Sequence, residues 1–182
     1  MTHKNIEFKA KCSDPGKIKE ILISRKADFK GIDIQVDTYF KVNSGRLKLR
    51  EGKIENALIY YERSDTKEPK KSDVTLFKYD PNSSSSLREI LTKSLGVLVV
   101  VSKQRAIYFI ENIKFHIDNV ENLGSFVEVE AIDIDGTIGI EKLREQCQFF
   151  LELFEISEEN LVSKSYSDLL IQSAPQNTKI IQ

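Results

Sequence analysis

The chain has 182 residues, of which 40% are hydrophobic and 30% are charged, a composition typical of one folded domain. With 27 basic and 28 acidic residues its net charge is −1, which provides no general attraction to nucleic acid or to an anionic membrane. No apolar run approaches the roughly 18 residues of a membrane-spanning helix, and the N-terminal segment lacks the apolar stretch of a secretion signal. We therefore expect a cytoplasmic protein with no membrane or nucleic-acid partner.

In the first half of the chain, alternation of polar and apolar residues predicts a strand over residues 5–11. Asp14 and Pro15 then form a typical helix start, and the apolar spacing behind them predicts a helix of about ten residues. The polar stretch 64–72 is predicted to be a loop. Further strands are predicted at residues 37–42, 46–50, 57–62 and 73–79.

The second half begins with a predicted helix from Leu87 to Leu95, ended by Gly96. A long amphipathic helix is predicted from Ile140 to about Phe154, followed by two short helices near residues 157–160 and 166–171. Strands are predicted at residues 97–105, 106–110, 114–120 and 126–132. This order indicates an α+β domain built on an antiparallel sheet. We expect a single domain over residues 1–172 and a disordered tail over 173–182.

Charged residues are segregated by sign on the predicted strands. Arg46, Lys48 and Arg50 share one face of a strand, whereas Glu128 and Glu130 share a face of another. One interpretation is a half-buried sheet whose charged side meets water. Like charges two residues apart repel, however, so a purely structural sheet gains nothing from the segregation. In a closed barrel the same residues would line the lumen as a basic wall facing an acidic wall, which suits a polyanion bound with Mg²⁺ or Mn²⁺.

Other chemistries have little support in the sequence. It contains no Walker-type phosphate loop, no Rossmann glycine motif and no nucleophile elbow. Cys12, Cys147, His3 and His116 are too few and too dispersed for a zinc finger, and the two cysteines are expected to be free thiols.

Five short motifs make the chain resemble the CYTH superfamily, the triphosphate tunnel metalloenzymes that include class IV adenylyl cyclases and thiamine triphosphatases. The family's E-x-E-x-K strand is similar to Asn5–Lys9, its L-R-x-R strand to Leu47–Arg50, and its later basic strand to Lys103–Arg105. The strongest match is the D-x-V-x-x-L-G-x-F-x-E-x-E signature at Asp118–Glu130, and the closing S-Y-x-x-L-L motif appears at Ser165–Leu170. The resemblance is closest to the class IV adenylyl cyclase branch.

The resemblance implies a closed or nearly closed antiparallel barrel of about eight strands with helices packed outside. It also implies a metal-dependent enzyme, with Mg²⁺ or Mn²⁺, acting on ATP, inorganic tripolyphosphate or thiamine triphosphate, and it allows a homodimer. The metal ligands it implies are Glu7, Asp118, Glu128 and Glu130. The substrate-binding residues it implies are Lys9, Lys11, Arg46, Lys48, Arg50, Arg63, Lys103 and Arg105. The catalytic residues among them are Glu7, Lys9, Arg50 and Arg105.

Two departures from the family pattern bear on the reaction. Asn5 stands where the family has its first glutamate, which removes one charged metal ligand. The family's central lysine strand is matched only by Arg63, with Lys71 beyond it.

Three hypotheses follow. The first is an enzyme, either a cyclase that converts ATP to cyclic AMP and pyrophosphate or a triphosphatase. The second, favoured by Asn5, is a module that binds polyphosphate or nucleotide without turnover. The third is a structural protein that uses only the barrel exterior, and the segregated charges argue against it.

Overall fold

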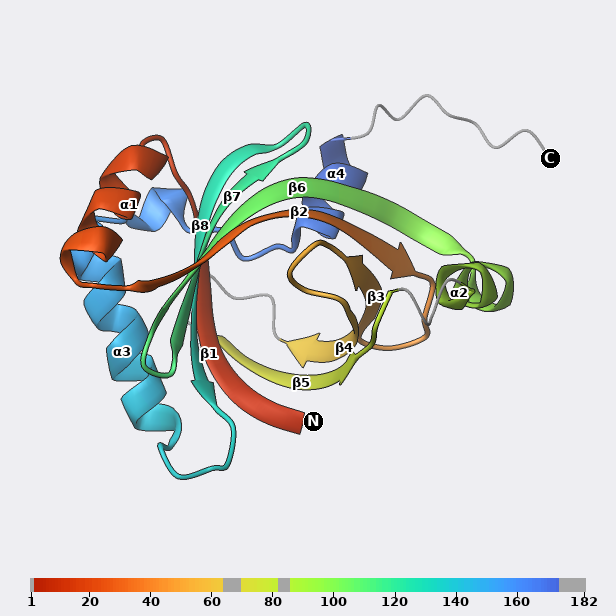
Figure 1. Ribbon diagram of the computed structural model, residues 1–182, viewed down its shortest axis with the longest axis horizontal. Helices are drawn as coiled ribbons and strands as arrows, with labels where there is room; N and C mark the ends of the chain where they lie inside the picture. Colours follow the sequence, from red (N-terminus) through yellow and green to blue (C-terminus); the bar gives the residue numbers. More distant parts are fainter. Residues whose placement is uncertain (1, 64–69, 82–85, 174–182) are drawn as a thin grey trace.

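The computed structural model describes residues 2–63, 70–81 and 86–173. Within them, eight strands close into an antiparallel barrel in the order β1-β5-β4-β3-β2-β6-β7-β8, with β8 paired back to β1 (Figure 1). The strands are β1 (Thr2–Lys11), β2 (Asp28–Phe40), β3 (Arg46–Glu51), β4 (Ala57–Arg63), β5 (Lys70–Lys78), β6 (Val97–Ile110), β7 (Ile113–Val120) and β8 (Gly124–Asp133). The expected α+β barrel is confirmed.

Helices pack on the outside of the barrel (Figure 1). α1 and α3 cover β1, β7 and β8, α4 contacts β6, and α2 contacts the far end of β2. Their bounds are α1 (Pro15–Ser24), α2 (Leu87–Leu95), α3 (Ile140–Leu153) and α4 (Tyr166–Ser173), with a short 3₁₀ helix at Glu158–Asn160. The Asp14 side chain accepts a hydrogen bond from the Lys17 backbone N–H at 3.0 Å, so the expected N-cap of α1 is confirmed.

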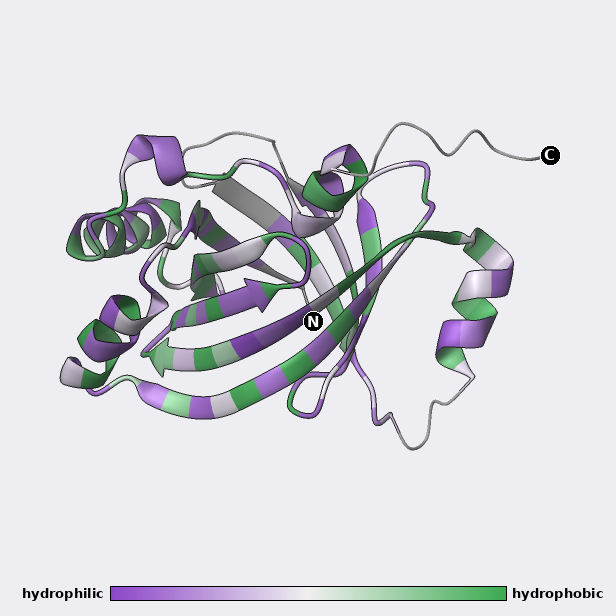
Figure 2. Ribbon diagram, turned by 90° about the horizontal axis from the view of Figure 1, so that it is seen from above, coloured by the Kyte–Doolittle hydropathy of each residue, from purple (hydrophilic) through white to green (hydrophobic). Residues whose placement is uncertain are grey.

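The main hydrophobic core lies between the barrel's outer wall and the helices, not inside the barrel. Ile6, Phe8 and Ala10 of β1 face outward and pack in one cluster with Leu143 and Phe150 of α3. Since side chains alternate along a strand, the intervening residues of β1 point into the lumen. The alternation is visible as bands of opposite hydropathy along the strands in Figure 2. The described helices include none with the length and apolar character needed to cross a bilayer.

Several strands extend beyond the bounds that the sequence pattern predicts. β2 begins at Asp28 rather than near residue 37, because it pairs along its length with β6, which is itself continuous across the expected break at residue 105. A register shift at Gly31, where φ is +122°, interrupts the pattern near the start of β2. β5 begins at Lys70, so the end of the expected loop 64–72 is strand, and residues 64–69 lie outside the described residues. The predicted tail also lies outside them from residue 174.

Candidate functional site: the ionic lumen of the barrel

The barrel encloses a cavity of about 350 Å³ whose lining includes residues from all eight strands, from the 54–56 loop and from the start of α4. Among the described lining residues, basic side chains outnumber acidic ones by seven to five. A highly charged anion would therefore meet only a small excess of positive charge in this lumen.

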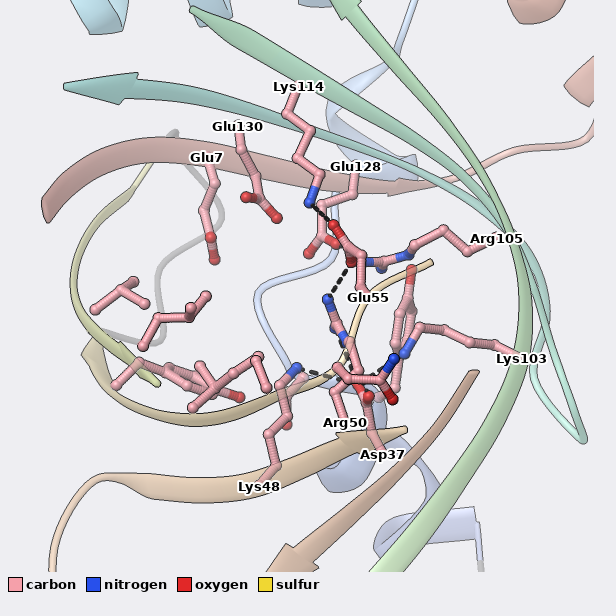
Figure 3. Close-up of a pocket in the computed structure, with 18 of the residues that line it drawn as sticks. Glu7, Asp37, Lys48, Arg50, Glu55, Lys103, Arg105, Lys114, Glu128 and Glu130 are labelled. Carbon is pink, nitrogen blue, oxygen red and sulfur yellow. Dashed lines mark hydrogen bonds and ion pairs between the residues drawn. The ribbon is translucent and has the colours of Figure 1, made fainter. Parts of the chain in front are cut away.

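Asp37 of β2 is the centre of one ionic cluster. Its carboxylate accepts hydrogen bonds from Lys48 at 3.1 Å, Arg50 at 2.9 Å and Lys103 at 2.7 Å (Figure 3). Although burial opposes ionisation, Arg50, Lys103 and Lys48 hold the pKa of Asp37 well below its usual value. Burial, helped by Arg50, Arg105 and Lys48, lowers the pKa of Lys103 to about 7 despite the attraction of Asp37. The cluster therefore contains a lysine that can change charge near neutral pH.

Arg105 of β6 links the basic side to the acidic one. It donates to both oxygens of Asp118, at 2.7 and 2.6 Å, and to Glu128 at 2.9 Å. The Tyr166 hydroxyl donates to Asp118 at 2.7 Å. Asp118 thus serves to fix Arg105 and Tyr166, and it is not among the residues that line the cavity.

Lys9 and Glu128 are directly opposite each other on β1 and β8 and form an ion pair at 2.8 Å. The Lys9 ammonium also lies 4.2 Å from the centroid of the Tyr166 ring. Burial disfavours the Glu128 anion, yet Lys9, His116 and Arg105 hold its pKa well below the usual value. Glu128 is therefore ionised and largely neutralised by its neighbours.

Glu7 and Glu130 form the next cross-strand pair along β1 and β8. Like charges directly opposite each other destabilise a sheet. Burial, together with Glu128 and Glu7, raises the pKa of Glu130 to about 7 against the opposing effect of Lys114. Figure 3 shows Glu7, Glu128 and Glu130 pointing into the same part of the cavity. This is the part of the lumen where a cation would relieve the most repulsion.

Asn5 adds a neutral oxygen to this region. It is only 2% exposed and lines the cavity, and its Oδ1 atom has no hydrogen-bond partner among the described residues. An unsatisfied buried oxygen beside carboxylates fits the all-oxygen ligand set that Mg²⁺ and Mn²⁺ prefer. Glu128 and Glu130 bring carboxylate oxygens within 4.8 Å of each other, Glu7 faces Glu130 across the strands, and Asn5 lines the same cavity, so these four residues are the candidates for holding a divalent metal.

A ring nitrogen of His116 and carboxylate oxygens of Glu128 and Glu130 all lie within 4.8 Å of one another, but the geometry of His116 fits a hydrogen-bond donor better than a metal ligand. Burial and the Arg105 charge lower the pKa of His116 to about 3, so the ring is neutral at pH 7. Arg105 Nη1 lies 3.5 Å from Nε2, and because arginine can only donate, Nδ1 carries the proton. Nδ1 faces Glu128 at 3.3 Å and Glu130 at 3.5 Å. His116 thus orients the two carboxylates.

Glu55 is a lumen residue that the sequence pattern did not reveal. It lies between Lys114, with which it forms a short ion pair, and Arg50, whose Nη1 is 2.9 Å from Glu55 Oε2 (Figure 3). The buried Asp33 carboxylate holds its loop by accepting the backbone N–H groups of residues 53, 54 and 55 at 2.7–3.0 Å. A spacing signal could not have identified Glu55, because it lies in a loop and its anchor is in the unpredicted part of β2.

The structure brings most of the predicted site residues together. Those that line the cavity are Glu7, Lys9, Lys48, Arg50, Lys103, Arg105, Glu128 and Glu130. Lys11 is exposed, and Arg46 forms an ion pair with Asp168 at 2.8 Å; neither lines the cavity. The side chain of Arg63 lies outside the described residues.

The expected separation into a basic and an acidic wall is wrong. Asp37 and Glu55 lie among the basic residues, and Lys9 and Lys114 lie among the acidic ones. The reason is that buried like charges are tolerated when opposite charges are placed between them.

The fold and the lumen define a closed antiparallel barrel with an ionic interior and external helices. A family model for the CYTH domain matches residues 3–166, so the chain belongs to the CYTH domain family and the resemblance in its motifs is confirmed. A Methanocaldococcus jannaschii protein, provisionally named an adenylate cyclase, is 30% identical over 175 residues, covering 90% of this chain and 97% of its own length.

Solved structures show the same fold. A Pyrococcus horikoshii protein superposes with a TM-score of 0.74 at 27% identity, covering 91% of this chain and 98% of its own. A Hippeastrum protein, provisionally named an adenylyl cyclase and described as having a dominant triphosphatase activity, superposes with a TM-score of 0.59 at 14% identity. That match covers 93% of this chain and 94% of the Hippeastrum chain and shows the likeness of fold alone.

Proposed function

We propose that the chain is a metal-dependent enzyme that cleaves a phosphoanhydride bond of a triphosphate-bearing substrate held in the lumen of the barrel. The observation that carries the proposal is the buried set of lysine and arginine side chains facing the cavity beside the Glu7–Glu130 pair. Membership of the CYTH family supports it. Burying so many charged side chains destabilises the ligand-free protein. An anion and a cation bound together in the lumen would offset that cost.

The phosphate oxygens would be bound by Lys9, Lys48, Arg50, Lys103 and Arg105. Arg50 and Arg105 are oriented by Asp37 and Asp118, so their guanidinium groups need no reorganisation when charge develops during the reaction. A donor that is held in advance and points to the oxygen on which charge develops stabilises the transition state more than the ground state. These two arginines are therefore the proposed catalytic residues. Lys9 is proposed to lie between the bound phosphates and the carboxylates of Glu128 and its neighbours.

Glu7, Glu128 and Glu130, with Asn5, are proposed to hold Mg²⁺ or Mn²⁺. A divalent ion there would neutralise phosphate charge and help to position the chain of phosphates. The small excess of basic residues in the lumen supports this requirement, because a triphosphate carries more negative charge than the lining can offset alone. Asp118, proposed from the sequence as a further ligand, is instead proposed to position Arg105.

Two reactions fit this site. In cyclisation, the ribose 3′-oxygen bonds to the α-phosphorus, the bond from that phosphorus to the bridging oxygen breaks, pyrophosphate leaves and the hydroxyl loses its proton. The name of the Methanocaldococcus jannaschii relative favours this reaction. In hydrolysis, the oxygen of water bonds to the γ-phosphorus, the bond from that phosphorus to the β–γ bridging oxygen breaks, the diphosphate part of the substrate leaves, and water loses a proton as orthophosphate forms.

A binding assay combined with product analysis tests the proposal. The protein is incubated with ATP, tripolyphosphate or thiamine triphosphate and Mn²⁺, and Arg50→Ala serves as the impaired variant. Cleavage by the unmodified protein that falls at least a hundredfold in Arg50→Ala supports the proposal. Tight binding of all three without cleavage would favour the binding-module hypothesis instead.

A further inference from the structure

One wall of the cavity carries no charge over most of its length. It is formed by Ala57, Ile59 and Tyr61 of β4, by Val74 and Leu76 of β5, and by Ile54 from the preceding loop. Ile59 is directly opposite Leu76, and Tyr61 is opposite Val74, so the apolar side chains form a continuous patch across two strands. We call these six residues the apolar wall.

The apolar wall is separate from the core that supports the helices. Its residues on β4 and β5 form a cluster of their own inside the barrel. Val74 and Leu76 are only half-buried, and the Ile54 side chain is 43% exposed although its backbone is fixed by Asp33. Apolar surface is thus presented to the cavity, where a ligand could cover it.

A phosphate chain gains nothing from this wall, since a charged group placed against hydrocarbon loses hydration without finding a partner. The phosphates are therefore confined to the ionic side, near Arg50 and Arg105. An inorganic polyphosphate would leave the wall uncovered, whereas an organic substituent on the phosphate chain could lie against it.

Lys78 lies opposite Ala57 at one end of the wall and is exposed, whereas two polar groups at the edge of the wall are engaged within the protein. The Tyr79 hydroxyl donates to the Arg50 carbonyl oxygen at 3.1 Å, and the Asn56 amide both donates to and accepts from Gly52, at 2.9 and 3.1 Å. Recognition at the wall would depend on apolar contact more than on hydrogen bonds to the edge of a particular base.

We propose that the substrate is an organic triphosphate ester whose non-phosphate part is an aromatic or alkyl body lying on the apolar wall, and that inorganic tripolyphosphate is a poor ligand. This inference rests on the proposed function, because it takes the phosphate chain to lie on the ionic side.

Calorimetry with two uncleavable ligands tests it: phenyl triphosphate and tripolyphosphate, each with methylene groups in place of the bridging oxygens. With Mn²⁺ present, the phenyl ligand is expected to bind about tenfold more tightly and with a more negative heat-capacity change, because it covers apolar surface. Leu76→Ala should remove most of this preference. Phe77→Ala is the matched control, since Phe77 is next on the same strand but 63% exposed.

Equal affinities of the unmodified protein for the two ligands would overturn the inference, and so would a preference that survives in Leu76→Ala. In either case tripolyphosphate binding that depends on Arg50 would leave the proposed function intact. If neither ligand bound, the proposed function would fall together with the inference. Leu76→Lys adds a positive result, since a cation on the wall should raise the affinity for the tripolyphosphate analogue at least tenfold.

Discussion

Replacing Glu55 with glutamine should strengthen polyanion binding. The Glu55 carboxylate occupies the space between Arg50 and Lys114, where it contacts the same cations that a phosphate would use. If a phosphate oxygen lies about 6 Å from this carboxylate, the two negative charges repel by roughly 3 kcal/mol at an effective dielectric constant of about 20. Salt and side-chain movement reduce this to about 2 kcal/mol, so we expect Glu55→Gln to lower the Kd about thirtyfold.

The assay is titration calorimetry with the methylene analogue of tripolyphosphate, at low and at physiological ionic strength. Glu62→Gln is the control, because it removes the same charge from an exposed position on the outside of β4. The gain in Glu55→Gln should shrink as salt is added, whereas Glu62→Gln should change affinity little. Unchanged or weaker binding by Glu55→Gln at low salt would refute the idea that Glu55 competes with the ligand.

Three further predictions follow from the lumen. Asn5→Glu should tighten Mn²⁺ binding at least tenfold in calorimetry while lowering the melting temperature of the metal-free protein, and Asn5→Ser should do neither of these. Because the folded-state pKa of Lys103 is about 7 and its ordinary value is 10.5, the affinity for a polyanion should fall as pH rises from about 7 to 9. The unfolded chain keeps that proton over the same window, so the contribution of Lys103 to folding stability should rise with pH, and Lys103→Met should flatten both profiles. Gly52→Ala would place a Cβ atom 2.6 Å from Asp33 Oδ2, so it should cost about 2 kcal/mol of stability in denaturant titrations, and Lys53→Ala should be nearly neutral.

Strand alternation predicted most of the lumen residues once the family resemblance had implied a closed barrel. In β1 and β8 the period-two pattern places Glu7, Lys9, Glu128 and Glu130 on one face, and the structure has all four lining the cavity. A two-residue period decides the face of a strand directly, so such residues are predictable once the barrel is assumed.

Pairing between strands could not be predicted in the same way. The pattern separates basic from acidic strands. The ion pairs that actually form depend on strand register and on side-chain length. Asp37, which lies among Lys48, Arg50 and Lys103, is an example. Glu55 and its anchor Asp33 are 22 residues apart, and no local signal relates them. Arg46 was expected in the site from its strand position, but it pairs with Asp168 of α4. The position of α4 against the barrel cannot be predicted from the strand pattern.

The most direct test of the central claim is phosphorus NMR of ATP incubated with the protein and Mn²⁺, repeated with Glu130→Gln and with the exposed control Glu62→Gln. We predict that ATP is converted either to cyclic AMP and pyrophosphate or to ADP and orthophosphate, that Glu62→Gln does the same, and that Glu130→Gln loses nearly all of the conversion. Unchanged ATP in every sample, or full conversion by Glu130→Gln, would contradict the account of the lumen as a metal-dependent catalytic site.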